Sequence, residues 1–129
     1  MSVKFLGLAD VIELQWRQIR EFGGSDGIRN AAMLRSALAS ARGGSGDQPS
    51  DAGVFDVAAS YLVNLVRDQP FVDGNKRTGL ASAIQFLSLN GKKLTANEDA
   101  VLELVQSVAK NETDKGKIAD FLRQNSQDR

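Results

Sequence analysis

The sequence contains no cysteine and no histidine, and only 2 of its 129 residues are proline. The absence of cysteine excludes disulfides, thiolate metal sites and cysteine nucleophiles, and it is compatible with a reducing compartment. Without histidine, no side chain has an unperturbed pKa near neutrality. Any general base must therefore be a carboxylate or a lysine with a strongly lowered pKa.

An excess of one charge is also lacking, because 16 Lys and Arg balance 16 Asp and Glu. A balanced chain has no overall basic field to hold nucleic acid through its phosphates, so we expect no direct nucleic-acid binding. Nowhere do about eighteen apolar residues follow one another, and residues 1–8 lack the pattern of a secretory signal. We therefore expect a cytoplasmic protein that does not contact membranes.

The remaining composition is that of one folded domain. The chain is 42% hydrophobic and 25% charged, which is typical of a soluble globular protein. A chain of this length is within the usual range for a single hydrophobic core and is short for two. We expect one domain over residues 1–129.

Apolar residues recur at helical spacing in six stretches. These stretches are residues 8–21, 30–41, 54–68, 75–89, 97–110 and 114–124. No alternating apolar pattern is long enough to predict a sheet. Residues 43–53 are rich in Gly, Ser and Asp and are predicted to form a flexible surface loop, and residues 125–129 are expected to fray. The predicted fold is all-α, a compact bundle of about six helices.

Two apolar stripes define the faces that we expect to be buried. Ile12, Trp16 and Ile19 share one face of the first predicted helix, which favours a core position for Trp16 over a role as a base-stacking platform. Ile84 and Leu87 share a face of the fourth. Both faces are predicted to pack inside the bundle.

The segment most informative about function is residues 69–79, Gln-Pro-Phe-Val-Asp-Gly-Asn-Lys-Arg-Thr-Gly, which connects two helices that we expect to be buried. Pro70 ends the first of them and places Gln69 at its exit. The N–H groups of residues 74–76 begin the next helix, and with the helix dipole they would form a phosphate site.

The charges of this segment favour a bound anion. Lys76 and Arg77 lie at a helix start, where the dipole disfavours positive charge. Asp73 supplies a carboxylate beside them, and Mg²⁺ typically takes one or two carboxylates together with substrate phosphates. From the residues alone an ordinary helix connection fits equally well, with Phe71 in the core and Asp73 or Asn75 as a cap.

In residue type, order and position, the same segment resembles the active-site loop of the Fic/Doc family, His-x-Phe-x-Asp/Glu-Gly/Ala-Asn-Lys/Gly-Arg. The resemblance covers most of the chain and is nearest to the Doc branch, the toxins of toxin–antitoxin pairs. Lys76 stands where the AMP-transferring members have glycine, and Leu80 stands in place of their second motif arginine. The resemblance thus implies a helical kinase that uses ATP, phosphorylates elongation factor Tu and arrests translation.

The resemblance also implies site residues and a partner. Gln69, Asp73 and Asn75 occupy the catalytic positions, and Asp73 would hold Mg²⁺. The phosphates of ATP would be held by Gly74, Asn75, Lys76 and Arg77. Arg67 is a further candidate, although a cation at a helix C-terminus is also favourable for dipole reasons alone. The implied partner is a small antitoxin protein whose disordered segment folds as a helix into a groove of the toxin.

Gln69 departs from the family pattern because it replaces the catalytic histidine. A glutamine amide does not titrate near neutrality, so it cannot accept the proton of the target hydroxyl. Loss of a general base typically lowers a rate by about 10²- to 10⁴-fold. The glutamine is either a substitution made so that a toxic protein can be produced, which we favour, or a natural change. AMP transfer, or a catalytically inactive domain that binds nucleotide or antitoxin, are the alternative functions.

Overall fold

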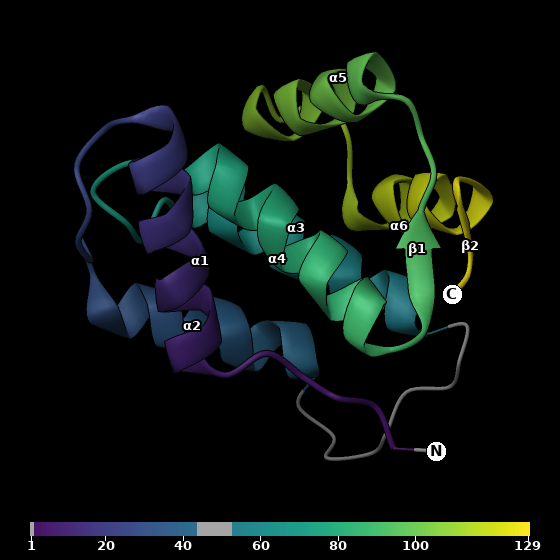
Figure 1. Cartoon of the computed structure of the whole chain (residues 1–129), viewed down its shortest axis with the longest axis horizontal. Helices are drawn as coiled ribbons and strands as arrows, with labels where there is room; N and C mark the ends of the chain where they lie inside the picture. The colour runs from purple at the N-terminus through teal and green to yellow at the C-terminus, as the bar shows by residue number, and fades with distance from the viewer. Residues whose placement is uncertain (1, 44–52) are drawn as a thin grey trace.

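The computed structural model describes residues 2–43 and 53–129. Within them the chain forms six helices and a small sheet (Figure 1). In order these are α1 (Leu8–Phe22), α2 (Ala31–Arg42), α3 (Val54–Asp68), α4 (Asn75–Leu89), β1 (Lys92–Leu94), α5 (Glu98–Ala109), α6 (Lys115–Gln124) and β2 (Ser126–Asp128). The predicted helical bundle is confirmed. Of the loop predicted at residues 43–53, residues 44–52 lie outside the described residues.

The helices begin where side-chain caps are available. Asn30 accepts a hydrogen bond from the N–H of Met33, Asn97 from that of Ala100, and Asp114 from that of Lys117. Each cap satisfies one of the N–H groups that a helix start leaves without an acceptor. In the described part of the chain, no helix combines the length and the apolar character needed to cross a bilayer.

Helices α3 and α4 form the centre of the molecule and share its most extensive interhelical contact. In Figure 1, α1 and α2 lie at one end of this pair, and α6 with the two strands lies at the other. Helix α3 contacts α2, α4, α5 and α6, so it is surrounded on most sides. Its long apolar surface, visible in the sequence, is buried as a result.

Small side chains on α4 allow this close approach. The buried residues in its first half are Thr78, Gly79, Ser82 and Ala83. A Cβ atom at Gly79 would lie 3.0 Å from Cγ2 of Val66 and 3.2 Å from the main-chain oxygen of Leu62. The small residues therefore form the face turned to α3, and the prediction that Ile84 is buried was wrong, since its exposed fraction is 41%.

The orientation of α1 also differs from the prediction. Trp16 is 43% exposed, and the guanidinium of Arg20 lies 4.4 Å from its ring centroid. The buried residues of α1 are Val11 and Gln15. The side chain of Gln15 donates a hydrogen bond from Nε2 to the main-chain oxygen of Asp73, at 3.1 Å. The helix is turned so that this polar contact is buried, which leaves Trp16 outside the core.

The end of the chain is ordered, contrary to our expectation that it frays. Strand β2 pairs antiparallel with β1, so that Lys92 lies opposite Asp128. Nζ of Lys92 is 2.7 Å from Oδ1 of Asp128, and the N–H of Thr95 donates to the oxygen of Asn125 at 2.7 Å. Three-residue strands are too short to give a recognisable alternating pattern, so the sequence did not predict this sheet.

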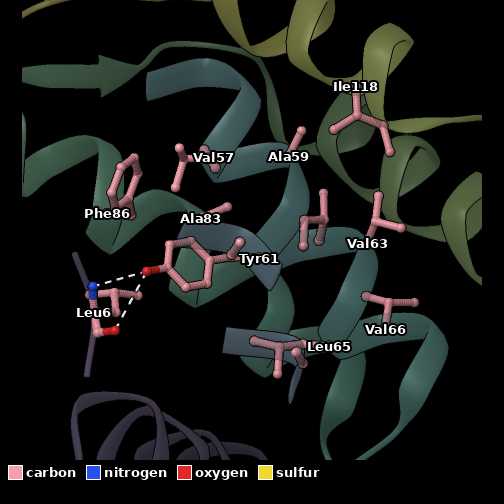
Figure 2. Packing of buried hydrophobic residues seen from close by; sticks show 14 of the residues in the cluster. Leu6, Val57, Ala59, Tyr61, Val63, Leu65, Val66, Ala83, Phe86 and Ile118 are labelled. Carbon is pink, nitrogen blue, oxygen red and sulfur yellow. Dashed lines mark hydrogen bonds between the residues drawn. The ribbon is translucent and has the colours of Figure 1, made fainter. Parts of the chain in front are cut away.

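Tyr61 connects α3 to the segment that precedes α1 (Figure 2). The N–H of Leu6 donates to the Tyr61 hydroxyl at 3.0 Å, and the hydroxyl donates to the oxygen of Leu6 at 3.5 Å. Both residues are buried, and the Tyr61 ring centroid lies 5.4 Å from that of Phe86. Burial raises the pKa of the Tyr61 phenol above its usual value, with smaller opposing effects from its hydrogen bond to Leu6 and from Arg42.

We expect Tyr61→Phe to lower the free energy of unfolding by about 1–3 kcal/mol, because it leaves the buried N–H of Leu6 without an acceptor. Because burial raises the pKa of Tyr61, the free energy of unfolding also depends on pH. Below about pH 10 the phenol is protonated in both states, and above it the unfolded chain loses the proton first. The stabilising contribution of Tyr61 is thus complete below this pH and is lost as the pH rises. Urea unfolding from pH 8 to 11 measures both effects, and equal curves for the two proteins would contradict them.

Candidate active site

A cleft with a volume of about 810 Å³ opens where the end of α3 and the start of α4 meet α5. Every residue predicted for the site lines it, namely Arg67, Gln69, Asp73, Gly74, Asn75, Lys76 and Arg77. The facing wall is largely apolar and includes Leu102, Val105, Val108 and Ala109 of α5. The cleft therefore places a charged loop opposite a largely apolar face of α5, an arrangement suited to a ligand with one charged and one apolar end.

The start of α4 has the features of an anion site. Gly74, with φ 73°, is the N-cap and provides no side-chain cap. The N–H groups of Asn75, Lys76 and Arg77 therefore have no acceptor within the helix. The first turn contains no acidic residue to compensate the helix dipole. An anion in the cleft would satisfy both the N–H groups and the two cationic side chains.

The side chain of Asn75 is used within the loop. Its Oδ1 accepts the N–H of Phe71 at 3.0 Å, and its Nδ2 donates to the Phe71 oxygen at 3.1 Å. This pair of bonds closes the loop on the helix start while Phe71 is buried in the core. The contribution of Asn75 to an anion would accordingly come from its main-chain N–H.

Asp73 lines the cleft, and both oxygens of its carboxylate accept hydrogen bonds from main-chain N–H groups. Oδ1 accepts the N–H of Gly74 at 2.8 Å, and Oδ2 accepts the N–H of Ser25 at 3.3 Å. Each carboxylate oxygen retains a lone pair for another ligand. Among the described residues, no three His, Cys, Asp or Glu side chains are grouped to hold a metal ion. Asp73 fits a divalent cation such as Mg²⁺, which typically binds through one or two carboxylates together with waters and substrate phosphates.

Gln69 adopts an unusual main-chain conformation. It is the C-cap of α3, with φ 49° and ψ 57°, in the left-handed region that residues other than glycine seldom occupy. The residue is exposed and lines the cleft. Position 69 thus presents its side chain to the same space as Asp73 and the start of α4, which is where a group acting on a bound substrate must lie.

The two arginines at the site have different surroundings. Nη2 of Arg67 donates to the main-chain oxygen of Thr113 at 2.7 Å and so connects the end of α3 to the segment before α6. The guanidinium of Arg77 lies 4.5 Å from the ring centroid of Phe22, at the end of α1. Arg67 therefore has a structural contact of its own, and phosphate binding by either arginine stays a prediction.

Several neighbours of the site were not found from the sequence. Residues 23–30, between α1 and α2, border the loop through Ser25 and Arg29, and α5 supplies the apolar wall. The glycines at residues 23–27 are typical of a turn, but nothing local indicates that this turn lies against residues 68–73. The apolar residues of α5 followed the helical period and gave no sign that some of them face a cleft instead of the core.

The chain is similar in sequence to known proteins over much of its length. A family model described as Fic/DOC family matches residues 5–87. A protein named Toxin Doc, from Mycolicibacterium smegmatis, is 35% identical over 100 residues, which cover 76% of this chain and 77% of that protein. A protein named Protein kinase doc, from Escherichia phage P1, is 39% identical over 70 residues, which cover 54% of this chain and 55% of that protein.

Proposed function

The chain belongs to the Fic/DOC family, and we propose that it is a Doc-type toxin that transfers the terminal phosphate of ATP to a hydroxyl group of elongation factor Tu. Its homologues include one protein named as a toxin and one named as a protein kinase. The observation that carries the proposal is the cleft, in which the uncapped, cationic start of α4 faces an apolar wall from α5.

The two walls of the cleft suit the two ends of a nucleotide. The N–H groups at the start of α4, with Lys76 and Arg77, would bind the phosphates. The apolar residues of α5 would cover the base and the sugar. Leu80, in the cleft where AMP-transferring relatives carry an arginine, favours transfer of the terminal phosphate over transfer of AMP. We therefore propose that the group transferred from ATP is its terminal phosphate.

Asp73 would hold Mg²⁺ together with the phosphates of ATP. Its carboxylate is exposed at the cleft and fixed by two main-chain N–H groups, so it is oriented before a metal binds. When bound, the cation would neutralise charge on the phosphates. The chain itself would supply the orientation of that carboxylate and the positive charges of Lys76 and Arg77.

Residue 69 would act on the attacking hydroxyl group. In the transfer, the hydroxyl oxygen of the target forms a bond to the terminal phosphorus, the bond from that phosphorus to ADP breaks, and the hydroxyl proton passes to a base. The family's histidine fills this role, and Gln69 cannot, because its amide does not titrate near neutrality. We propose that the chain binds its substrates but transfers phosphate slowly.

Binding of ATP by the chain as it stands tests the phosphate site separately from catalysis. We expect isothermal titration calorimetry to detect binding of ATP with Mg²⁺. Lys76→Gln and Arg77→Gln should each weaken it by roughly tenfold or more, because hydrogen bonds to charged groups contribute about 1.5–3 kcal/mol. Arg35→Gln, on the exposed face of α2, is the control with the same change of charge. Equal affinities in all four proteins would contradict the assignment.

Two further properties belong to this proposal. A toxin of this type requires a small antitoxin protein as its partner, and a translation factor as target places the protein in the cytoplasm.

The second candidate function is a catalytically inactive domain that binds nucleotide or antitoxin. The observation in its favour is Gln69 itself, which occupies the cleft at the catalytic position without being able to accept a proton.

A further inference from the structure

The main chain of the site loop is held by residues 23–30, the segment between α1 and α2. The N–H of Val72 donates to the oxygen of Gly27 at 3.0 Å. The N–H groups of Arg29 and Asn30 both donate to the oxygen of Pro70, at 2.8 and 3.0 Å. An isolated β-bridge pairs residue 28 with residue 71. A neighbouring segment therefore holds the main chain of Pro70 and Val72, while the side chain of Asn75 holds that of Phe71.

The side chain of Arg29 extends this contact to the end of α3. Its Nε donates to the main-chain oxygen of Gln69 at 2.7 Å, and its Nη2 donates to that of Asp68 at 2.8 Å. The last carbonyl groups of a helix have no donors within the helix, and a positive charge is favourable beside them. The guanidinium supplies both donors in one rigid plane, so it fixes two successive carbonyl groups at once.

One of these carbonyl groups belongs to Gln69, whose main-chain conformation is unfavourable. Within the described residues, Gln69 and Asn111 are the two residues other than glycine with positive φ. A left-handed conformation of this kind persists where the surrounding structure holds it. At position 69 the hydrogen bond from Arg29 to the residue's own oxygen restrains the main chain from which the side chain enters the cleft.

We propose that Arg29 is a positioning residue that holds residue 69 in its left-handed conformation and thereby directs the side chain at this position into the cleft. The proposal rests on the proposed function only for the role of residue 69 in the reaction. Its conformational part stands on the hydrogen bonds of Arg29 alone. Arg29 would act through residue 69 and without touching the substrate, so its loss should change the rate of transfer more than the binding of ATP.

The conformational part is tested by NMR on the chain as it stands. The three-bond coupling between the amide and Hα protons of Gln69 reports its φ angle. We expect this coupling, and the carbonyl carbon shifts of Asp68 and Gln69, to change in Arg29→Gln and to stay unchanged in Arg35→Gln. If the coupling of Gln69 is the same in all three proteins, Arg29 does not hold this conformation and the proposal is wrong.

The functional part is tested with histidine at position 69. In Gln69→His, the further change Arg29→Gln should lower kcat on the order of 10- to 100-fold, as small misplacements of a catalytic group do. The KM for ATP should change little, since Lys76 and Arg77 are untouched. Equal losses in kcat and in ATP affinity would indicate general disruption of the cleft and would overturn a positioning role.

A conservative variant keeps the test decisive if Arg29→Gln does not fold, as judged by circular dichroism. Arg29→Lys retains the charge, but one ammonium group cannot bind both carbonyl groups in the planar fork. We expect it to keep the fold and to show the same changes in coupling and kcat to a smaller extent, and wild-type values of both would overturn the proposal. If Gln69→His transfers no phosphate while the coupling changes as expected, the proposed function fails and the role of Arg29 in holding residue 69 stands.

Discussion

Replacing Gln69 with histidine is expected to raise the rate of phosphate transfer from ATP to elongation factor Tu by on the order of 10²- to 10⁴-fold, the usual contribution of a general base. The structure offers the side chain a suitable place, because position 69 lines the cleft together with Asp73 and the start of α4. An imidazole there can accept the proton of the attacking hydroxyl group. The measurement is transfer of label from ATP carrying ³²P in its terminal phosphate.

Two controls make this result specific. Gln69→Asn retains an amide that does not titrate, so it should show no gain in rate. In Gln69→His the rate should rise with pH through about 6.5, the usual pKa of an imidazole, because only the neutral form accepts a proton. A gain that Gln69→Asn shares, or that is independent of pH, would mean that the histidine does not act as the base.

The label also separates the alternative functions. ATP labelled in the α-phosphate should give no labelled target, whereas an AMP-transferring protein would transfer this label. If Gln69→His transfers neither label and leaves growing cells unharmed, while ATP still binds, the chain is a binding domain. In that case the phosphate site at Lys76 and Arg77 would remain, and the catalytic role of residue 69 would be withdrawn.

The second large effect is expected at Gly24, which lies against the carboxylate of Asp73. A Cβ atom at Gly24 would lie 2.5 Å from Oδ2 of Asp73 and 3.1 Å from Cδ1 of Ile19. Gly24→Ala must therefore displace the carboxylate that we assign to Mg²⁺. With histidine at position 69, we expect this change to lower the rate on the order of 10²-fold, since small misplacements at a reacting centre have effects of that size.

Gly23→Ala is a matched control for the effect on the main chain. Gly23 and Gly24 both have positive φ, 87° and 112°, so alanine is strained by roughly 1–3 kcal/mol at either position. A Cβ atom at Gly23 would meet nothing within 4 Å. Thermal unfolding should show comparable losses of stability, whereas only Gly24→Ala should lose activity and require more Mg²⁺. Equal activities in the two variants would exclude Asp73 as the metal ligand.

The helices were predictable because their signals are local. Asn30, Asn97 and Asp114 stand at the starts of predicted stretches of helical period, and the structure shows that each of them caps a helix. The site loop was predictable for a related reason, since Gly74 and the cations after it lie within a few residues of one another. Neighbours in sequence at a helix start are neighbours in space, whatever the rest of the chain does.

The errors concern residues whose environment depends on other elements. Trp16 fits the apolar stripe of α1, but α1 buries Val11 and Gln15, and Gln15 contacts the loop before α4. Ile84 fits the stripe of α4, but α3 packs on the small residues of the adjacent face. Helical period shows that a helix has an apolar side, and it does not decide which part of a wide apolar side is covered.

The sequence by itself determined the helical fold, and it predicted one domain, an anion-binding helix start and position 69 as the place of the family's histidine. Only the tertiary structure decided what surrounds that helix start: the apolar wall of α5, the N–H of Ser25 on Asp73 and the guanidinium of Arg29 behind residue 69. The physical reason is the distance along the chain over which each kind of interaction acts. Caps, helical periods and a helix dipole act over a few residues. Ser25 and Arg29 reach the site across 48 and 40 residues of chain, and such contacts exist only once the helices have packed.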